Sequence, residues 1–389
     1  MNRQISLFEE HRLTLDEAIN LSLSSLQEYG QRYQHWSVAY SGGKDSSATV
    51  TFVAWAIKSG LVHPPQSLTV LYADTRQELP PLQQSAVRLM ASLEQDGFRT
   101  QIVLPELDNR FYVYMLGRGV PPPKNHFRWC TPRLKVEPMA LALSSLREQS
   151  QQKLLMLTGV RLGESAARDE RISISCSKDS GECGQGWFQV STSQAVADTL
   201  APLLHWRVCH IYDWLYFDNR HGYHIADIAT VYGESDVRTG CIGCNLIGED
   251  ITLKQLVRNP QWSSLEPLME IKPLFRELTK AKWRKRKIEP EQRKDGSYAR
   301  NVQRLGPLTF AARAYGLERI LDIQHRAGVD LINVEEVARI RGLWALNTWP
   351  DGWTGDEISG NELINALRIT SGNQVVEQPL LVGTSTSIC

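Results

Sequence analysis

The chain has no long apolar run and no excess of either charge. None of its 389 residues lies in a stretch that approaches the roughly 20 consecutive apolar residues a membrane-spanning helix needs. Its 43 basic and 43 acidic residues balance, so any surface for nucleic acid must be a local patch. The first 19 residues carry four acids and no apolar core, which argues against a secretory or transit peptide. We therefore expect a cytoplasmic protein with no membrane partner.

Cysteine is also scarce. Seven cysteines in 389 residues do not fit a small domain held together by disulfides, so a metal-binding or redox role is the better interpretation. The hydrophobic content of 42% and the charged content of 22% are ordinary for a globular protein. At one domain per roughly 150 residues, the length predicts two domains.

The stretch from Ser41 to Ser46, with the sequence SGGKDS, carries the strongest functional signal. Residues 36–40 before it are predicted to form a short buried strand, and residues 47–58 after it a helix with one apolar face. Strand, glycine turn and helix bind anions, because glycine lets the backbone turn tightly and the new helix presents unpaired N–H groups. The predicted nucleotide-binding residues of this loop are Ser41, Gly42, Gly43, Lys44, Asp45 and Ser46.

Lys44 and Asp45 carry the charges of this loop. Lys44 supplies a positive point charge for a phosphate, and Asp45 can hold a magnesium-bound water. The loop is not a Walker loop, in which the first glycine and the Gly-Lys pair are more widely spaced. The alternative interpretation is an ordinary Gly–Gly turn that happens to precede a helix.

Three further strands are predicted over residues 67–72, 100–104 and 154–157, with helices between them. Strands separated by helices of this length imply parallel βαβ units, so the predicted fold class is α/β, a parallel twisted sheet flanked by helices. Ligands of such sheets bind beyond the carboxyl ends of the strands. The additional nucleotide-binding residues expected there are Asp74, Thr75, Gly159, Arg161 and Arg168.

Several of these assignments have a plainer alternative. Asp74 can be a cap or turn residue, and the two arginines can pair with acidic residues on the surface of a helix. Residues 117–135 form a cationic, proline-rich loop that either binds a second anionic group or lies solvated on the surface. Residues 173–200 are rich in Ser, Gly and Gln and are predicted to be a long insertion.

The pattern changes to helices and loops in the last third of the chain. The predicted division is 1–248 for the nucleotide-binding domain, 249–372 for a mainly helical, basic region and 373–389 for a disordered tail. Residues 272–304 hold twelve Lys and Arg against four acids, a marked local excess of positive charge. This excess predicts either a solvated helix face or a surface that holds a nucleic-acid backbone. Its densest part runs from Arg284 to Lys287.

Cys241 and Cys244 are the strongest metal signal. Two thiolates at this spacing, with glycines beside them, can share one metal. One interpretation is an iron–sulfur cluster that also uses Cys130 and one more cysteine. The candidates for this fourth ligand are Cys183, Cys209 and Cys176, and Cys183 is favoured because glycines flank it in a loop.

Two other interpretations of the cysteine pair stay open. A structural zinc site can use His221 and His224, which lie just upstream at HxxH spacing. The remaining interpretation is a pair of buried thiols with no metal.

The loop from Ser41 to Ser46 matches the SGGxDS signature of the PP-loop ATP pyrophosphatases residue by residue, and the chain resembles that superfamily. Three further motifs occur in the order typical of its phosphoadenylylsulfate (PAPS) reductase-like branch: Asp74-Thr75, Arg128-Trp129-Cys130-Thr131 and Gly159-Val160-Arg161. Over roughly residues 35–248, the chain most resembles the DNA phosphorothioation sulfurtransferases of the DndC and SspD type. It lacks the catalytic cysteine motif that true PAPS reductases carry near the C-terminus, and Glu182-Cys183-Gly184 is the only similar local sequence.

The resemblance implies a fold like that of the adenine nucleotide alpha hydrolases and an enzyme that cleaves ATP between its α and β phosphates. It implies magnesium, a [4Fe–4S] cluster and a catalytic role for Lys44, Asp45 and Arg161. DNA is the implied substrate, a cysteine desulfurase the sulfur donor, and other phosphorothioation proteins the further partners. The alternatives are tRNA thiolation, a PAPS or APS reductase-type enzyme, and a non-catalytic ATP-sensing module.

Overall fold

The computed structural model divides the chain into two compact units, each built from two separate stretches of sequence. Unit 1 comprises Met1–Pro105 and Thr131–Thr239, and unit 2 comprises Glu106–Cys130 and Gly240–Cys389. The structure describes residues 12–177, 181–192, 194–232, 239–292, 295–299 and 301–378. The predicted boundary after residue 248 differs from this division, because the segment 106–130 packs with the C-terminal part of the chain.

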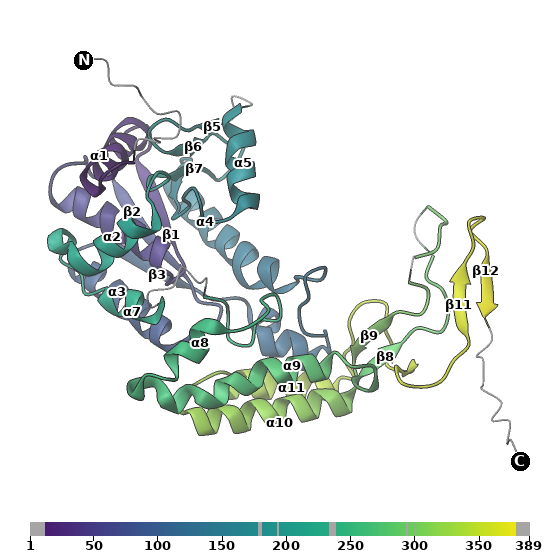
Figure 1. Cartoon of the computed structure of the whole chain (residues 1–389). Coiled ribbons are helices and arrows are strands. Elements are labelled where there is room, and N and C mark those ends of the chain that lie inside the picture. The colour runs from purple at the N-terminus through teal and green to yellow at the C-terminus, as the bar shows by residue number, and fades with distance from the viewer. Residues whose placement is uncertain are drawn as a thin grey trace, which may run out of the picture. The chain divides into compact units, whose positions relative to one another are not determined.

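Unit 1 is built on a seven-stranded sheet with the strand order β3-β2-β1-β4-β7-β6-β5. The strands are His35–Tyr40 (β1), Ser67–Ala73 (β2), Arg99–Val103 (β3), Leu154–Leu157 (β4), Gly181–Glu182 (β5), Trp187–Gln189 (β6) and Ala197–Ala201 (β7). The first five strands in this order are parallel, whereas β6 and β5 are antiparallel to their neighbours. The predicted α/β class and its mostly parallel sheet are confirmed (Figure 1).

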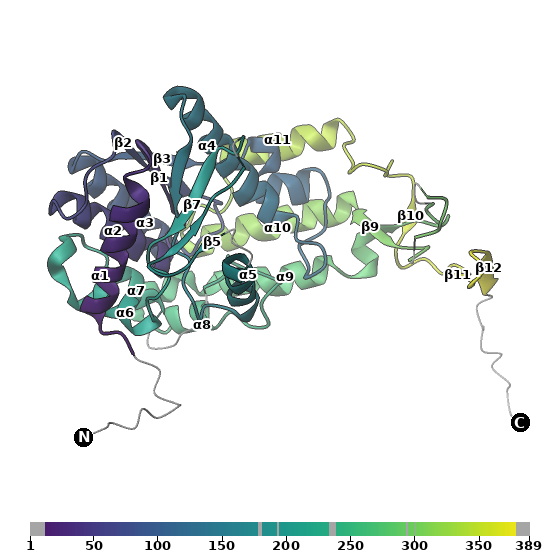
Figure 2. The ribbon, with the colours of Figure 1, turned by 90° about the horizontal axis from the view of Figure 1, so that it is seen from above.

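Helices cover both faces of this sheet (Figure 2). They are Leu15–Ser25 (α1), Lys44–Lys58 (α2), Pro80–Gln95 (α3), Glu137–Ser150 (α4), Ala166–Ser177 (α5), Val208–Tyr212 (α6) and Ala226–Tyr232 (α7). Helices α2, α3 and α7 lie over one face and α4 over the other. On that second face, Met139 and Leu143 of α4 pack against Leu71 and Val103 of the sheet. Short π-helical and 3-10 turns add Leu26–Gly30, Pro132–Val136, Asp213–Phe217 and Asn219–His221.

The stretch 173–200 is not an insertion outside the fold. Its described residues end α5 and form β5, β6 and β7, and β7 pairs in parallel with β4. The strand β7 contains a buried Asp198, which weakens its apolar pattern. Its carboxylate accepts hydrogen bonds from the Tyr33 hydroxyl at 2.5 Å and from the Ser191 backbone N–H at 2.6 Å. Tyr33 is 165 residues away from Asp198, and a partner so distant in sequence leaves no local signal, which is why the prediction was wrong.

The order of the strands reverses direction beside β1. The chain runs from β1 through β2 to β3 on one side, and then returns to place β4 on the other side of β1. In parallel α/β sheets such a reversal opens a crevice at the carboxyl ends of the two flanking strands, and ligands bind there. The stretch Ser41–Ser46 follows β1, and Gly159 follows β4.

Unit 2 is mainly helical, as predicted for the C-terminal region. Its helices are Ile251–Leu256 (α8), Ile271–Leu278 (α9), Phe310–Ala327 (α10) and Val334–Ala345 (α11), with 3-10 helices at Leu107–Asn109, Pro260–Glu270 and Ala281–Trp283 and a π-helical turn at Val113–Gly117. Its strands are Arg284–Arg286 (β8), Leu305–Leu308 (β9), Ile358–Ser359 (β10), Ala366–Ile369 (β11) and Val375–Gln378 (β12). Strands β10, β8 and β9 form one small sheet, and β11 and β12 form a hairpin (Figure 1).

A fully buried arginine, Arg313, ties the parts of unit 2 together. Its guanidinium donates to Leu308 O at 3.1 Å, to Gly117 O at 3.0 Å and to Thr348 O at 2.9 Å. These carbonyls belong to β9, to the segment 106–130 and to the chain after α11. One side chain therefore holds three distant segments, because a buried guanidinium must find hydrogen-bond acceptors.

The end of the chain differs in part from the predicted tail. Strand β12 lies inside the stretch 373–389 that was predicted to be disordered, and residues 379–389 lie outside the described part of the chain. Among the described residues, no helix has both the length and the apolar character required to cross a membrane.

Candidate functional site

The Ser41–Ser46 loop connects β1 to the N-terminus of α2. Gly42 has a φ of 74°, a left-handed conformation that favours glycine, and Gly43 precedes the helix in an extended conformation without a capping side chain. The Ser46 hydroxyl donates to Gly43 O at 3.0 Å and accepts from the Ser41 N–H at 3.2 Å. Ser46 therefore shapes the turn, while the first turn of α2 directs its N–H groups towards the carboxyl edge of the sheet.

Three charged side chains meet at this turn. Arg161, which is 4% exposed, donates from Nε to Asp45 Oδ1 at 2.5 Å. Lys44, also 4% exposed, places Nζ 3.7 Å from Asp45 Oδ2. Two cations around one carboxylate leave a net positive charge where the helix dipole is also positive. The structure thus brings together the three predicted catalytic residues in an arrangement suited to an anion.

Gly159, at the carboxyl end of β4, approaches the loop more closely than any other residue type permits. A Cβ atom built on Gly159 would lie 2.9 Å from Ser46 N and 3.0 Å from Asp45 O. Both contacts are with backbone, which cannot move aside as a flexible side chain can. Gly159 therefore allows β4 to lie against the start of α2, and this approach carries Arg161 to Asp45.

Tyr232, the last residue of α7, is a site residue that the sequence did not reveal. Its hydroxyl accepts a hydrogen bond from Lys44 N at 3.3 Å and another from Thr239 Oγ1 at 2.9 Å. The Lys44 ammonium lies 4.8 Å from the centre of the Tyr232 ring. Burial raises the pKa of Tyr232, so the hydroxyl stays protonated at neutral pH. Lys44 and Tyr232 are 188 residues apart, and no motif marks such a pair in the sequence.

Asp74 and Thr75 lie at the carboxyl end of β2, as predicted, but both hold local structure. Asp74 accepts from Arg76 N at 2.8 Å and from Gln83 Nε2 at 3.3 Å, which is the turn role that the sequence left open. Thr75 is 1% exposed and donates from its hydroxyl to Glu78 Oε1 at 2.6 Å. Burial raises the pKa of Glu78.

Arg168 lies one turn into α5 and forms an ion pair with Glu164, the residue four positions earlier. Its side chain is 42% exposed. This is the helix-surface pairing that the sequence offered as the alternative to phosphate contact. Among the described residues, no hydrogen bond or ion pair joins Arg168 to the Ser41–Ser46 loop.

Cys241 and Cys244 form a tight turn in unit 2. The Cys244 N–H donates to Cys241 O at 3.1 Å, and both cysteines are partly buried and outside any disulfide. Gly243 between them has a φ of 69°, and a Cβ there would lie 2.4 Å from the Ile271 side chain. The glycine-flanked turn thus keeps the two cysteines close along the backbone.

Cys130 is also outside any disulfide, and it belongs to the same unit. Its neighbour Trp129 stacks on Phe111 with ring centres 5.2 Å apart, and Phe111 lies 5.5 Å from Phe275. The ring of Phe275 in turn lies 3.2 Å from the position that a Gly243 Cβ would take. One aromatic cluster therefore links the surroundings of Cys130 to the turn between the other two cysteines.

The remaining predicted metal ligand is placed differently. Cys183 is bonded to Cys176 in a disulfide of unit 1, so its sulfur is not a free thiolate. The structure does not bring Cys183 together with the other three predicted ligands. No group of three or more His, Cys, Asp or Glu side chains suited to a metal ion occurs within the residues that the structure describes.

The zinc alternative does not fit the histidines. His221 is buried, with Nε2 3.1 Å from Trp214 O, and its Nδ1 accepts from Tyr223 N at 2.9 Å. Because both ring nitrogens already have partners, neither is available for a metal. His224 is exposed and lies 3.6 Å from Asp227.

A family comparison now identifies the chain. The model of the phosphoadenosine phosphosulfate reductase domain matches residues 35–244. The chain belongs to this family. The matched residues include β1, the charged loop, β4 and both cysteines of the Cys241–Cys244 turn. A comparison with curated proteins finds no match.

Three solved structures are similar to the chain at low identity. PAPS reductase from Candida auris, in a phosphate complex, is 12% identical over 59% of this chain and 95% of its own, with a TM-score of 0.36. FMN adenylyltransferase from Candida glabrata, with FMN and the ATP analogue AMPCPP, is 16% identical over 56% of this chain and 62% of its own, with a TM-score of 0.34. The U34-tRNA thiolase NcsA from Methanococcus maripaludis, with its [4Fe-4S] cluster, is 12% identical over 67% of this chain and 80% of its own, with a TM-score of 0.34.

The basic stretch of this reductase-domain protein is not a helix face. Arg284 to Arg286 form β8, and the charged groups are used within unit 2. Lys285 Nζ donates to Glu357 O at 2.6 Å, and Arg286 Nη2 donates to Gly360 O at 2.5 Å. Lys287 Nζ donates to Gly352 O at 2.6 Å and lies 3.1 Å from Glu357 Oε1. The densest cationic run thus stabilises the small sheet, a role that composition alone does not reveal.

Proposed function

We propose that this protein is an ATP pyrophosphatase that activates a DNA backbone phosphate for sulfur transfer. The observation that carries the first half is the Lys44–Asp45–Arg161 cluster at the carboxyl edge of the sheet. Two buried cations and the start of α2 suit the phosphates of a nucleotide. Membership in the phosphoadenosine phosphosulfate reductase domain family supports an enzyme that handles adenine nucleotides.

Each residue of the cluster has a distinct part in the proposed reaction. Lys44 and Arg161 bind the phosphate oxygens and neutralise the charge that develops as pyrophosphate leaves. Asp45, released from Arg161 when the nucleotide binds, holds the hydrated magnesium ion. Magnesium, when bound, supplies a further positive charge to the phosphates. Tyr232 orients Lys44 through its ring and its hydroxyl.

The proposed acceptor is a non-bridging oxygen of a DNA phosphate. This oxygen attacks the α phosphorus of ATP, the bond to the β phosphate breaks, and pyrophosphate leaves. The terminal sulfur of a persulfide then attacks the activated DNA phosphorus, and AMP departs with the original oxygen. A thiol finally cleaves the remaining S–S bond. A cysteine desulfurase is the expected source of the persulfide, and other phosphorothioation proteins are the expected partners.

Cys130, Cys241 and Cys244 are the residues that would hold a [4Fe–4S] cluster. None of the three is in a disulfide, and one aromatic cluster links their surroundings. The fit to such a group is partial, because the described residues contain no group of three or more His, Cys, Asp or Glu side chains suited to a metal ion. When bound, the cluster would supply a site for sulfur or electrons. The family resemblance supports this assignment.

The test combines two products of one reaction. Purified protein is incubated with ATP, magnesium, a cysteine desulfurase, cysteine, a thiol and either DNA or tRNA. Pyrophosphate is measured directly, and sulfur in the nucleic acid is measured by mass spectrometry after nuclease digestion. We expect pyrophosphate release and a phosphorothioate-linked dinucleotide from DNA.

A matched pair of variants makes this test specific. Lys44→Ala should abolish both products, while Lys58→Ala, which alters a lysine at the other end of α2 paired with Asp96, should leave both unchanged. Thiolated bases from tRNA with unmodified DNA would refute the DNA assignment. ATP binding without pyrophosphate release would refute the enzyme assignment and favour an ATP sensor.

A further inference from the structure

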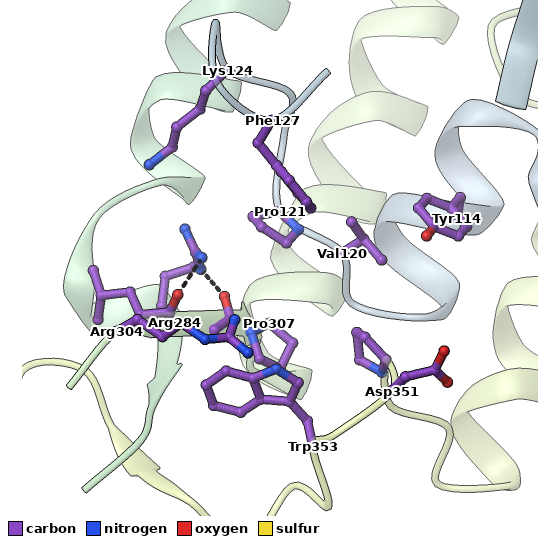
Figure 3. A pocket seen from close by; sticks show the side chains of 13 residues that line it. Tyr114, Val120, Pro121, Lys124, Phe127, Arg284, Arg304, Pro307, Asp351 and Trp353 are labelled. Atoms are coloured by element: carbon purple, nitrogen blue, oxygen red, sulfur yellow. Dashed lines mark hydrogen bonds between the residues drawn. The ribbon is translucent and has the colours of Figure 1, made fainter. Parts of the chain in front are cut away.

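Unit 2 contains a cavity of about 430 Å³ that the proposed reaction does not use (Figure 3). Its walls come from three segments: the loop before Cys130, the strands β8 and β9, and the chain that follows α11. The volume is within the range of about 300–1,000 Å³ that is usual for small-molecule sites. The cavity therefore has room for a ligand much larger than a simple inorganic ion.

Positive charge dominates the wall. Arg284 is 4% exposed, donates to Gly306 O and, at 3.2 Å, to Leu305 O, and uses one side of its guanidinium for both bonds. Its Nη1 is buried and has no hydrogen-bond partner in the described part of the chain. A buried donor without an acceptor is costly, and a ligand anion would satisfy it.

Lys124 lies on the same wall and adds a second cation. Burial and the neighbouring Arg284 charge lower the pKa of Lys124. No carboxylate pairs with either of them among the residues that the structure describes. An anionic group between them would relieve this repulsion.

Aromatic and planar groups complete the wall. Phe127 is 46% exposed, although a phenyl ring is usually buried. The Arg304 guanidinium lies 5.1 Å from the centre of the Trp353 ring, and its two bonds to Glu291, at 2.6 and 2.8 Å, hold it there. Exposed rings and fixed guanidinium planes are the surfaces on which nucleic-acid bases stack.

The cation and the exposed ring are held at a fixed spacing. Lys124 N donates to Phe127 O at 3.2 Å, and Phe127 N donates to Lys124 O at 2.9 Å, so a tight turn joins them. The Lys124 and Phe127 side chains both extend from this turn and line the cavity (Figure 3). A nucleotide has the matching pair of groups, a phosphate joined to a flat base.

We infer that this cavity binds one nucleotide of a single-stranded nucleic acid, with its phosphate on Lys124 and Arg284 and its base on Phe127. The inference rests on the proposed function, because it assigns a holding site for the nucleic-acid substrate. An acidic peptide would use the cations but would leave the ring unused. The pairing of charge with planar surfaces therefore favours a nucleotide.

The test measures binding of a short fluorescein-labelled single-stranded oligodeoxynucleotide to the full chain by fluorescence anisotropy over a series of salt concentrations. Lys124→Gln should reduce the slope of log K against log salt by about 0.7, the value for one lost phosphate contact on a single strand. Phe127→Leu keeps an apolar side chain but removes the aromatic face. It should weaken binding roughly 5- to 100-fold, as expected for one stacked base.

Lys282→Gln is the matched control, because Lys282 already pairs with Glu277 at 2.7 Å and does not line the cavity. It should bind with the wild-type slope. Wild-type slope in Lys124→Gln together with wild-type affinity in Phe127→Leu would overturn the inference. Binding of polyglutamate that Lys124→Gln abolishes and Phe127→Leu does not change would also overturn it, in favour of an acidic peptide.

Two further measurements complete the test. One distinguishes a polynucleotide from a free nucleotide as the ligand, and the other distinguishes this inference from the proposed reaction. Free dTMP should compete only weakly; competition at the affinity of the oligonucleotide would overturn the assignment to a polynucleotide. Pyrophosphate release from ATP in the presence of saturating DNA tests the Ser41–Ser46 loop separately from this cavity. A protein that binds the oligonucleotide at this cavity but releases no pyrophosphate would keep the inference and refute the proposed reaction.

Discussion

Arg161 Nε lies 2.5 Å from Asp45 Oδ1, across the point where the strand order of the sheet reverses. The two residues are 116 positions apart, one after β4 and one at the start of α2. Their pairing compensates the Arg161 charge, which is almost fully buried. It also places a carboxylate and a guanidinium, the two groups a magnesium–phosphate complex requires, at the same point.

This pairing predicts different effects on activity and on stability. Arg161→Ala should slow pyrophosphate release. Loss of this positioned charge should remove about 2–4 kcal/mol of transition-state stabilisation. It should also lower the free energy of unfolding by up to about 3 kcal/mol, because Asp45 loses its buried partner. Urea unfolding and a pyrophosphate assay measure the two effects.

The double variant Asp45→Asn with Arg161→Ala tests whether the lost stability comes from this pair. In Arg161→Ala the Asp45 carboxylate keeps, among the described residues, only Lys44 Nζ, at 3.7 Å, so Asp45→Asn should cost less stability there than it does in the wild type, while pyrophosphate release stays low. If Arg161→Ala retained wild-type turnover, Arg161 would have only a structural role.

Gly159→Ala should impair nucleotide binding without a change of charge. The new methyl group would lie 2.9 Å from Ser46 N, so β4 and the loop must separate. We expect a marked rise in the KM for ATP and a lower melting temperature. Gly184→Ala, at a glycine of the same unit with no atom within 4 Å of its Cβ position, is the control and should behave as wild type. Equal ATP affinity in the two variants would show that the close approach is unimportant.

Tyr232→Phe tests the tyrosine beneath Lys44. The ring stays, but the hydroxyl that accepts from Lys44 N and Thr239 Oγ1 is lost. We expect a stability loss of about 1 kcal/mol and a higher KM for ATP. Tyr223→Phe removes a comparable hydroxyl bond, 2.7 Å to Asp96, away from the loop. It should cost similar stability but leave the KM unchanged, and a KM effect of equal size in both would contradict the assignment.

The hydrogen bonds of Asp108 with two arginines predict that unit 2 loses stability in acid. Hydrogen bonds from Arg339 and Arg118 lower the pKa of Asp108 from 3.8 to about 2. Because the folded-state pKa is lower than the unfolded one, the stabilisation is present above about pH 4 and disappears as pH falls through about 2. The difference between the folded-state and unfolded-state pKa corresponds to about 2 kcal/mol in the free energy of unfolding. Asp108→Asn should therefore be less stable than wild type at pH 6, and the two unfolding curves should converge near pH 2.

Removal of single cysteines tests the proposed cluster. Anaerobically purified protein should be brown with broad absorbance near about 400 nm, as expected for iron bound by cysteine. Cys241→Ser and Cys130→Ser should each lose this absorbance and the bound iron, measured by metal analysis. Cys209→Ser, at an exposed free cysteine, is the control and should retain both. Iron retained in Cys130→Ser would exclude that residue as a ligand.

Much of the fold could be predicted because its signals are local. The run from β1 through the glycine turn to α2 follows from apolar residues, two glycines and a charged pair that are consecutive in sequence. The same holds for β2, for β4 and for the long helices α10 and α11. Strand β7 was missed, because one partner of its buried Asp198 is Tyr33, 165 residues away in the chain.

The site was predictable only where residue identity decides chemistry. A loop with the sequence SGGKDS after a strand indicates an anion site in almost any context, so Lys44 and Asp45 could be named. The partnership of Arg161 with Asp45, the close approach of Gly159 and the place of Tyr232 depend on how β4 and α7 pack beside β1. Such contacts join positions more than a hundred residues apart, and nothing in the local pattern encodes them.

The sequence by itself determined the glycine turn after β1, the parallel sheet and the helical character of the C-terminal region, because these rest on short-range backbone and side-chain preferences. Only the tertiary structure decided the use of each charge. It assigned the cations of Arg284 to Lys287 to backbone carbonyls of unit 2, and Cys183 to a disulfide with Cys176. A charged or sulfur-containing side chain can serve a ligand or the fold, and its partners in space, which the sequence does not show, decide between the two.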